Sequence, residues 1–390
     1  METRPKLSKR MKTTNILIVV DKFDYHGSHI NGPTQNYSWL LERLDKNRYN
    51  AHLYALRRKG KSYDTFKRKG IAITYLNLGK FNLFTIFVIM RIIQRKKIDI
   101  LHLQGYGSVV CGLIAGTICR KPIIVKEEWV DPNISRLQSF LDYLLSTFTT
   151  RAIAISKYAR KFLIEKKGMK EDKIVLIPNG IPVDEFRDAA KKGGKYRRKE
   201  FGISDDVTVV GMVGMLHANK GHRYFIDAAH SVTRQNPNTK FMIIGDGEIR
   251  SKLEQQVAQL GLENHVIFAG HQSNMPEVLT MLDIFVMASI SETWPTSLME
   301  AMAAKKPIIT SDSGGSSEII KDGLTGLIVP VKDSMAIAEK INYLIDNPFQ
   351  GSFLAENAQQ ESEKYNINST VQQVQDLYEE IYLQHKNSDT

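Results

Sequence analysis

Residues 283–304 read DIFVMASISETWPTSLMEAMAA and combine a strand, a loop and a helix. Residues 283–289 form a short apolar run, which favours a buried strand. Residues 296–304 are rich in Met, Ala, Leu and Glu, which favour a helix. Because a strand, a loop and a helix in succession form the repeating unit of α/β domains, this stretch predicts an α/β fold.

The start of the predicted helix is suited to bind an anion. Thr296, Ser297 and Leu298 lie in its first turn, where backbone N–H groups have no acceptor within the helix. Those donors and the positive end of the helix dipole suit a phosphate. Glu292 precedes the helix and Glu300 follows one turn later, and both carboxylates can accept hydrogen bonds from sugar hydroxyls. A phosphate site between two such acids predicts a site for a nucleotide sugar.

Spacing alone would also fit an ordinary helix with two solvated glutamates. The segment ETWPTSLME at 292–300, however, resembles the E-x7-E signature of retaining glycosyltransferases of family 4. Its flanking sequences ASISE and EAMAAKKPIITSDSGGSSEII are similar to the family as well. This resemblance implies a GT-B fold, in which two doubly wound Rossmann-like domains face a cleft. It also implies transfer of a sugar from a nucleotide donor.

The length and composition are typical of a soluble globular protein. The 390 residues predict two or three domains, and 42% hydrophobic with 24% charged residues is an ordinary balance. Cys111 and Cys119 lie eight residues apart on one predicted helix and cannot pair, so we expect reduced thiols in a cytoplasmic protein. No zinc-ligand spacing is present, and no apolar run is long enough to span a membrane.

The charge is unevenly distributed along the chain. Residues 1–186 contain 33 Lys and Arg against 16 Asp and Glu, whereas the remainder contains 20 against 26. We expect the basic half to meet an anionic membrane surface, a phosphate-bearing acceptor or a nucleic acid, or simply to be solvated. Within it, residues 81–97 combine an apolar face with a basic end, which suits either a membrane interface or a helix packed on a sheet.

The first half opens with a predicted strand at 15–20, a turn-rich loop at 24–34 and a helix from residue 35. In doubly wound domains such a loop faces the ligand, and the resemblance implies that Gly32 lets the backbone approach the donor phosphate or the acceptor. Further strands are expected at 51–56, 71–76, 98–103, 122–125, 151–156 and 173–179, and further helices at 83–95, 108–118 and 157–167.

Two residues at predicted strand ends are candidates for catalysis. The run IDILHL resembles the family's D-[IV]-[IV]-H and places His102 at the family's histidine, although a histidine there is also commonly structural. The segment KEEWVDP follows the strand at 122–125, where many family members have a histidine. Glu128 stands at that position, or Glu127 if the register shifts by one, and whether Glu128 orients the acceptor stays open.

A phosphate-binding loop is expected in the second half. The sequence MVGMLHANKGH resembles the family's phosphate loop, with Gly214 and Lys220 in place. Lys220 would supply a point charge to a diphosphate beside helical N–H donors. Met215 replaces the family's arginine, which leaves His217 or Arg223 to compensate.

Other parts of the second half complete the expected donor site. Gly245, in IGDGE, fits the family's glycine turn better than a dinucleotide fingerprint, which would need a third glycine. The backbone at Ile267 and Phe268 is expected to pass the nucleobase. The remaining strands are predicted at 206–214, 239–245, 264–270, 307–311 and 324–330, and the remaining helices at 316–321, 333–346 and 354–385.

These patterns predict a domain order and a function. The segments are a basic tail (1–14), an acceptor-binding domain (15–186), a linker (187–206), a nucleotide-sugar domain (207–365) and a helix returning to the first domain (366–390). The expected enzyme is a cytoplasmic retaining hexosyltransferase, peripheral at the inner face of the membrane, that serves cell-surface polysaccharide or glycolipid assembly. It needs a nucleotide diphosphate sugar and a sugar, lipid-linked or phosphate-bearing acceptor, with no metal or other cofactor.

The resemblance also assigns individual roles, and other functions remain open. Glu300 is expected to bind the ribose, Glu292 the donor sugar, and Lys220 the leaving diphosphate. The alternatives are a GT-B epimerase or hydrolase of nucleotide sugars and a catalytically poor GT-B binding subunit, which Met215 and Glu128 suggest. A nucleic-acid-binding protein is a further alternative, but only the charge supports it, because no recognised nucleic-acid module is present.

Overall fold

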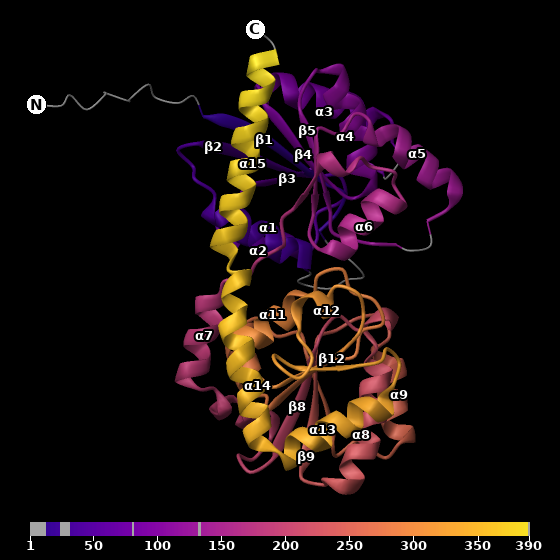
Figure 1. Cartoon of the computed structure of the whole chain (residues 1–390), viewed down its shortest axis with the longest axis vertical. Coiled ribbons are helices and arrows are strands. Elements are labelled where there is room, and N and C mark those ends of the chain that lie inside the picture. Colours follow the sequence, from indigo (N-terminus) through magenta and orange to yellow (C-terminus); the bar gives the residue numbers. More distant parts are fainter. Residues whose placement is uncertain (1–12, 24–31, 80–81, 132–133, 389–390) are drawn as a thin grey trace, which may run out of the picture.

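The computed structural model describes residues 13–23, 32–79, 82–131 and 134–388. Figure 1 shows two α/β domains, one above the other, with the interrupted helical segment at the end of the chain (348–388) running along both. The expected basic tail lies almost entirely outside the described residues, as does the loop that precedes Gly32.

The N-terminal domain contains a seven-stranded parallel sheet in the order β3-β2-β1-β4-β5-β6-β7. Its strands are β1 (Thr14–Val20), β2 (Tyr49–Ala55), β3 (Ile73–Tyr75), β4 (Ile100–Gln104), β5 (Ile123–Glu127), β6 (Arg151–Ala154) and β7 (Ile174–Leu176). Helices α1 (Gly32–Arg43), α2 (Ser62–Arg68), α3 (Phe84–Arg95), α4 (Tyr106–Ile118), α5 (Arg136–Ser146) and α6 (Lys157–Glu165) connect them.

The C-terminal domain contains a six-stranded parallel sheet in the order β10-β9-β8-β11-β12-β13. Its strands are β8 (Thr208–Val213), β9 (Thr239–Ile244), β10 (Val266–Gly270), β11 (Ile284–Met287), β12 (Ile308–Ser311) and β13 (Leu327–Val329). Its helices are α8 (His222–Gln235), α9 (Arg250–Gln259), α10 (Met275–Thr280), α11 (Thr296–Ala303), α12 (Ser316–Ile319), α13 (Ser334–Asp346) and α14 (Pro348–Glu361). The two sheets confirm the predicted pair of doubly wound Rossmann-like domains.

The continuous apolar runs in the sequence arise because helices cover both faces of each sheet. In β1, Ile16, Ile18 and Val20 pack into the core on one face. Leu17 and Val19 pack into a second core on the other face. Successive side chains of a strand point to opposite faces, so a central strand of this kind is apolar at every position.

The predicted strands all exist, but several boundaries and helices differ from expectation. Helices α2, α5, α7 (Val183–Lys192), α9 and α10 were not predicted. The single helix expected at 354–385 is interrupted by a 3-10 turn, η4 (Ser362–Tyr365), and resumes as α15 (Ile367–Ser388). The interruption occurs where the backbone bonds to another segment: Ile181 N–H donates to Tyr365 O at 2.8 Å, and Ile367 N–H donates to Ile181 O at 2.8 Å. Helical periodicity alone does not reveal such a partner.

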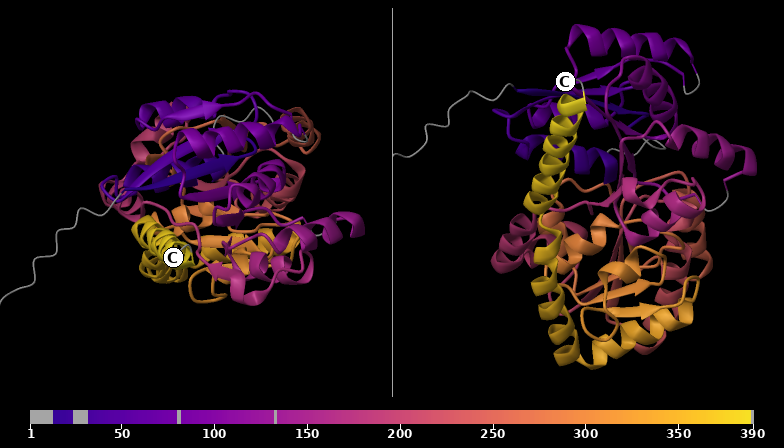
Figure 2. Two further views of the ribbon diagram at one scale, coloured as in Figure 1. Left: turned by 90° about the horizontal axis from the view of Figure 1, so that it is seen from above. Right: turned by 45° about the horizontal axis from the view of Figure 1, so that its top comes forward.

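Helix α15 fastens the end of the chain to the N-terminal domain, as Figures 1 and 2 show. The Tyr49 hydroxyl donates to Gln375 O at 2.9 Å, and the Asp45 N–H donates to the Gln375 side chain at 2.9 Å. The hydroxyl of the fully buried Tyr378 contacts His102 Nδ1 at 2.7 Å. None of the described helices combines the length and the apolar character that crossing a bilayer requires.

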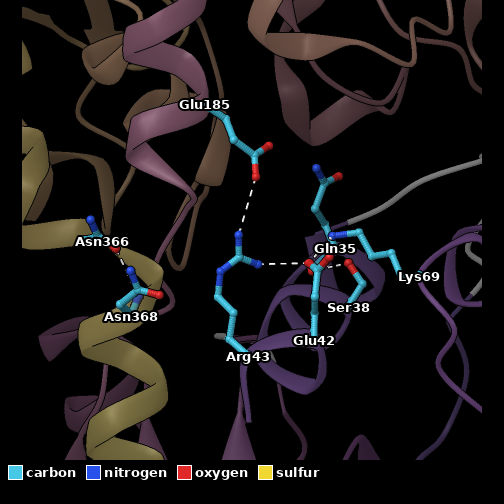
Figure 3. A network of polar contacts seen from close by, with 8 residues as sticks. All are labelled: Gln35, Ser38, Glu42, Arg43, Lys69, Glu185, Asn366 and Asn368. Carbon is cyan, nitrogen blue, oxygen red and sulfur yellow. Dashed lines mark hydrogen bonds and ion pairs between the residues drawn. The ribbon is translucent and has the colours of Figure 1, made fainter.

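The segment expected as a linker is mostly helical. Helix α7 (Val183–Lys192) and the 3-10 helix η2 (Lys195–Phe201) occupy much of it. Helix α7 packs against α10 and α11 of the C-terminal domain. Figure 3 shows Arg43 of α1 between Glu42 on its own helix, at 2.9 Å, and Glu185 of α7, at 3.4 Å. The interdomain connection is therefore held to the N-terminal domain by Arg43 and to the C-terminal domain by the packing of α7.

A buried arginine in η2 supports the strand that leads to the candidate site. Arg198 is fully buried, and its guanidinium donates to Met281 O at 2.6 and 2.8 Å and to Val207 O at 3.1 Å. It also pairs with Asp283 Oδ2 at 2.7 Å. These contacts fix the residues just before β11, whose carboxyl end carries the loop to Glu292.

Replacing this arginine should destabilise the fold strongly. Arg198→Ala removes the guanidinium from two carbonyl oxygens and from the Asp283 carboxylate, which keeps Val209 N–H as a donor, and this should cost about 3–5 kcal/mol of unfolding free energy. Arg197→Ala is the matched control, because Arg197 is the neighbouring residue and its guanidinium pairs with the exposed Glu200. This substitution should cost less than about 1 kcal/mol of unfolding free energy. Urea unfolding of both variants measures the difference; equal losses would show that the buried network contributes little.

Candidate active site

The candidate site lies where the strand order of the C-terminal sheet reverses. From β8 the chain proceeds through β9 to β10 on one side, and from β11 through β12 to β13 on the other. Ligands of open parallel sheets bind at such a switch point, outside the carboxyl ends of the strands. The loop after β8 carries Lys220 and the loop after β11 carries Glu292.

The structure joins these two residues in an ion pair. Lys220 Nζ lies 2.6 Å from Glu292 Oε1, and the Ser289 hydroxyl donates to the same oxygen at 2.7 Å. The Lys220 side chain is 24% exposed and that of Glu292 is 9% exposed, so the pair is reached from solvent mainly through the lysine. Two residues predicted from motifs 72 positions apart thus form one charged unit.

Glycines allow the loops around this pair to approach closely. Gly221 follows Lys220 with φ +73°, and a Cβ there would lie 1.9 Å from Ala288 O at the end of β11. Gly245 follows β9, and a Cβ there would lie 2.0 Å from Gly214 O. The backbones after β8, β9 and β11 are therefore in contact, which leaves backbone groups rather than side chains at the floor of the site.

The first turn of α11 offers fewer phosphate donors than expected. Leu298 N–H donates to Pro295 O at 3.2 Å, so the predicted role of Leu298 as a phosphate donor is not supported. The N–H groups of Thr296 and Ser297 have no backbone acceptor within the described part of the chain. Pro295 precedes them as the helix cap and has no N–H, so two donors remain at this end of the helix.

Glu300 is a buried acid without a hydrogen-bond partner among the described residues. It is 5% exposed, and no described residue donates a hydrogen bond to its carboxylate. Burial raises the pKa of Glu300 to about 7. A buried acceptor that the protein leaves unsatisfied is suited to receive hydroxyl hydrogens from a ligand.

His217 and Arg223 do not replace the arginine that is missing at Met215. His217 Nδ1 contacts Asn219 Oδ1 at 2.6 Å, and Nε2 lies 3.4 Å from Glu248 Oε1. The Arg223 guanidinium stacks on the Tyr224 ring at 5.3 Å, in an exposed position on α8. Lys220 is therefore the cation that the structure places at the switch point.

One residue of the site was missed from the sequence. His222 begins α8 and is 1% exposed, yet neither of its ring nitrogens has a hydrogen-bond partner among the described residues. A Cβ on Gly214 would lie 3.8 Å from its Cε1 and 4.0 Å from its Nε2. Burial, followed by the charge of Lys220, lowers the pKa of His222 to about 3, so the ring is neutral. In the sequence, the signal for His222 was a polar residue at the start of a helix, two positions after Lys220.

The structure describes both positions predicted for the nucleobase, but it describes the first-domain loop only from Gly32 onward. Ile267 and Phe268 lie on β10, an edge strand that pairs with β9 alone. Arg250 stacks over the Phe268 ring at 5.7 Å. Gly32 is the first residue of α1, and a Cβ there would meet nothing within 4 Å.

The position of His102 argues against a catalytic role. Its ring is fully buried, Nδ1 contacts the Tyr378 hydroxyl at 2.7 Å, and Nε2 contacts the Tyr37 hydroxyl at 3.4 Å. Burial, followed by the charge of Lys126, lowers the pKa of His102 to about 3. We therefore correct the expectation: His102 fastens α15 and α1 to the sheet, and its two nitrogens are already engaged.

Glu128 belongs to a polar network at the carboxyl ends of the N-terminal strands. Its carboxylate pairs with Lys126 Nζ at 2.7 Å and accepts from Gln104 Nε2 at 2.6 Å and Asn179 Nδ2 at 3.2 Å. Lys126 also donates to Asn179 Oδ1 at 2.8 Å. Glu128 is thus held rigidly at the edge that faces the other domain. The alternative register, Glu127, instead pairs with Lys167.

Four hydrogen bonds link the two domains beside the site. Next to Glu292, the Thr293 hydroxyl accepts from Val130 N–H at 3.3 Å, and the Trp294 indole donates to Asn179 O at 2.9 Å. Glu318 of α12 accepts from Lys157 N–H and Tyr158 N–H at the start of α6, at 2.8 and 2.7 Å. Glu292 therefore shares one loop with two of these interdomain contacts.

Family models match both halves of the chain. The model described as Glycosyltransferase Family 4 matches residues 39–185, and the model described as Glycosyl transferases group 1 matches residues 195–369. Together the two matches span most of the chain. The first ends at residue 185 and the second begins at residue 195, on either side of the interdomain segment.

Individual proteins agree with these models. The chain is 25% identical over 299 residues, 74% of its length and 77% of the relative, to the UDP-Gal:alpha-D-GlcNAc-diphosphoundecaprenol alpha-1,3-galactosyltransferase of Escherichia coli. It is 31% identical to the alpha-D-kanosaminyltransferase of Streptomyces kanamyceticus, over 51% of this chain and 53% of that protein. The crystal structure of HepE of Anabaena with UDP matches with a TM-score of 0.81 at 21% identity, covering 94% of this chain and 100% of that one. This likeness confirms the GT-B fold.

The buried acid should make the ligand-free protein less stable as the pH rises. Because the pKa of Glu300 is about 7 in the folded state and lower when unfolded, the folded state keeps a proton that the unfolded state loses. Stability should therefore fall between about pH 4.5 and 7, by about 3 kcal/mol in total. Glu300→Gln, which cannot ionise, should be the more stable protein at pH 8 and nearly equal at pH 5.

Thermal unfolding at both pH values measures this effect. Glu356→Gln is the control, because Glu356 is exposed and pairs with Lys305 at the surface. The same change with pH in the wild type and in Glu300→Gln would show that Glu300 is not the titrating group.

Proposed function

We propose that this chain is a glycosyltransferase of family 4, which transfers a sugar from a nucleotide diphosphate sugar with retention of anomeric configuration and without a metal ion. The observation that carries the proposal is the Lys220–Glu292 pair at the switch point of the C-terminal sheet. A cation for a diphosphate lies within 2.6 Å of an acid that can accept from sugar hydroxyls.

Lys220, the two acids and the start of α11 each have a role in this proposal. Lys220 and the free N–H groups of Thr296 and Ser297 receive the diphosphate at a helix start. Glu300 accepts hydrogen bonds from the ribose hydroxyls, which satisfies its otherwise unpartnered carboxylate. Glu292 accepts from the hydroxyls of the donor sugar. The diphosphate then replaces part of the contact that Lys220 makes with Glu292 in the ligand-free protein.

The chemistry of transfer depends mainly on charge and position. The bond between the anomeric carbon and the diphosphate oxygen breaks, and that oxygen keeps the electron pair. The acceptor hydroxyl bonds to the carbon on the same face, and its proton passes to the departing oxygen. Lys220 and the helix donors stabilise the charge that develops on the diphosphate, and the second domain positions the acceptor.

The named relatives suggest which donor and acceptor to test first. The Escherichia coli relative is named for UDP-Gal and for an acceptor on a diphosphoundecaprenol lipid, and HepE was solved with UDP and with UDP-glucose. We propose a nucleotide-sugar hexosyltransferase that acts on a lipid-linked or phosphate-bearing acceptor in cell-surface polysaccharide or glycolipid assembly. It would work at the cytoplasmic face of the membrane.

The stereochemistry of the product tests the proposal. A panel of nucleotide sugars is first screened by thermal shift, since a bound donor at 100 times its dissociation constant adds roughly 2.7 kcal/mol. The stabilising donor is then incubated with a lipid-linked acceptor, and the anomeric coupling of the product is read by NMR. An α-linked donor should give an α-glycoside. A β-linked product would overturn retention, and a donor that is epimerised or hydrolysed without acceptor would favour the alternative enzyme.

Lys220→Ala should lower turnover far more than stability. The ammonium acts on charge that develops at the leaving diphosphate, so the transfer rate should fall by about 10²–10³-fold. The pair with Glu292 is partly exposed, so unfolding free energy should fall by about 1 kcal/mol or less. Lys305→Ala, which breaks the exposed pair with Glu356, is the control and should change neither quantity. A large melting loss with a normal transfer rate would assign Lys220 to structure.

A further inference from the structure

Helix α5 has its apolar side outside. It begins at Ser135, whose hydroxyl accepts from Gln138 N–H at 3.2 Å, and runs to Ser146. Its exposed large apolar residues, with the adjoining Phe148, are Leu137 (69%), Phe140 (57%), Leu141 (43%), Tyr143 (52%), Leu144 (44%) and Phe148 (52%). Most of these are spaced by three or four residues, so they line one face of the helix.

On the side of α5 that faces the domain, Leu145 packs on the core, but the buried residues are polar. Asp142 and Ser146 are its buried residues, each 8% exposed. One carboxylate oxygen of Asp142 is buried without a hydrogen-bond partner, and burial raises the pKa of this acid. The Ser139 hydroxyl donates to Lys166 O, and Lys173 Nζ donates to Ser146 O at 3.2 Å. A helix of a water-exposed domain ordinarily shows the opposite arrangement.

Nothing described in the chain covers the apolar side of α5. No described helix or strand packs closely along it. Figure 1 and the right-hand view of Figure 2 show α5 projecting beyond the outline of the N-terminal domain. A contiguous apolar face of this kind on a soluble domain usually marks an interaction surface.

The charges around α5 indicate what it meets. Residues 134–173 contain nine Lys and Arg against four Asp and Glu. Arg136 lies in the first turn of α5, and Lys166 and Lys170 follow the adjoining helix, all exposed to solvent. An apolar helix face with a basic surround is the pattern of helices that lie in the interface of an anionic bilayer.

We propose that α5 is an interfacial helix that docks this chain on an anionic lipid bilayer. In this arrangement the face formed by Leu137, Phe140, Leu141 and Leu144 enters the region between the headgroups and the acyl chains. The basic residues meet the lipid phosphates. The purpose of docking rests on the proposed function, because docking would bring the enzyme to a lipid-linked acceptor. The contact with lipid itself needs neither donor nor turnover.

The position of α5 in the chain connects docking with the acceptor side. Trp129, 65% exposed, follows Glu128 directly, and α5 begins seven residues later. The carboxylate network around Glu128 therefore lies one short loop from the docking helix. A lipid-linked acceptor would meet Trp129 and Glu128 close to the point where the protein leaves the bilayer surface.

Helix α3, which the sequence suggested for this purpose, is the weaker candidate. It turns Thr85, Ile89 and Ile93 inward onto the sheet. Only Leu83, Phe84 and Phe87, near its start, are exposed large apolar residues. Its apolar face is thus largely used by the fold.

Vesicle binding of the full chain tests the proposal. Co-sedimentation is measured with phosphatidylcholine vesicles and with vesicles that also contain phosphatidylglycerol, at low and high salt. The wild type should bind the anionic vesicles, and salt should weaken this binding. Replacing Leu137, Phe140 and Leu141 together by Ser should weaken it by at least about tenfold. Because these side chains are exposed, melting temperature and nucleotide affinity should stay unchanged.

Two variants serve as controls. Phe349→Ser with Phe353→Ser removes exposed aromatics from α14 of the other domain and should bind vesicles like the wild type. Phe84→Ser with Phe87→Ser tests α3 and should have the smaller effect. Unchanged binding in the α5 variant, or loss of binding in the α3 variant alone, would overturn the proposal. Failure of the proposed function is seen separately, as absent transfer to an acceptor in detergent.

Discussion

The chain passes between its two sheets twice, and the two crossings are hydrogen-bonded to each other. The first crossing contains Ile181, and the second runs from Tyr365 to Ile367. Gly180 permits this approach, because a Cβ there would lie 2.8 Å from the backbone of Ile367. The remainder of the architecture depends on this junction: it turns the carboxyl ends of both parallel sheets toward one another and gives α15 its path along the first domain.

The two sheets offer similar helix starts at their switch points but use them differently. In the N-terminal sheet, the Asp21 carboxylate accepts from Gly107 N–H and Ser108 N–H at 3.0 and 2.8 Å. The protein's own acid therefore fills the start of α4. In the C-terminal sheet, the start of α11 keeps two N–H groups without backbone acceptors among the described residues, and Lys220 lies on the loop after the neighbouring strand, β8. This asymmetry explains in electrostatic terms why a diphosphate would choose the second domain.

The sequence predicted those parts of the molecule that follow from local pattern. The strands were visible because doubly covered strands are apolar throughout, and Lys220 and Glu292 were visible because each belongs to a motif. Long-range contacts were not visible. The burial of His102 under Tyr378 depends on a helix that returns from the end of the chain, and the break at η4 depends on Ile181.

Helix α5 escaped prediction for a different reason. The apolar face of α5 points to solvent, so the apolar periodicity of this segment does not reflect packing against a core. His222 was missed because its lack of partners is a property of the folded site alone.

The succession of Glu292, Thr293 and Trp294 has a thermodynamic consequence. The first contacts Lys220, for which we propose a role in binding the diphosphate, and the next two hold Val130 and Asn179 of the other domain. A rotation that separates the sheets has to break the last two contacts and pull on the loop that carries the first. Occupancy of the donor site and the angle between the domains are then linked variables, and the linkage is reciprocal. If a bound nucleotide stabilises the closed arrangement of the domains by a given free energy, domain closure strengthens nucleotide binding by the same free energy.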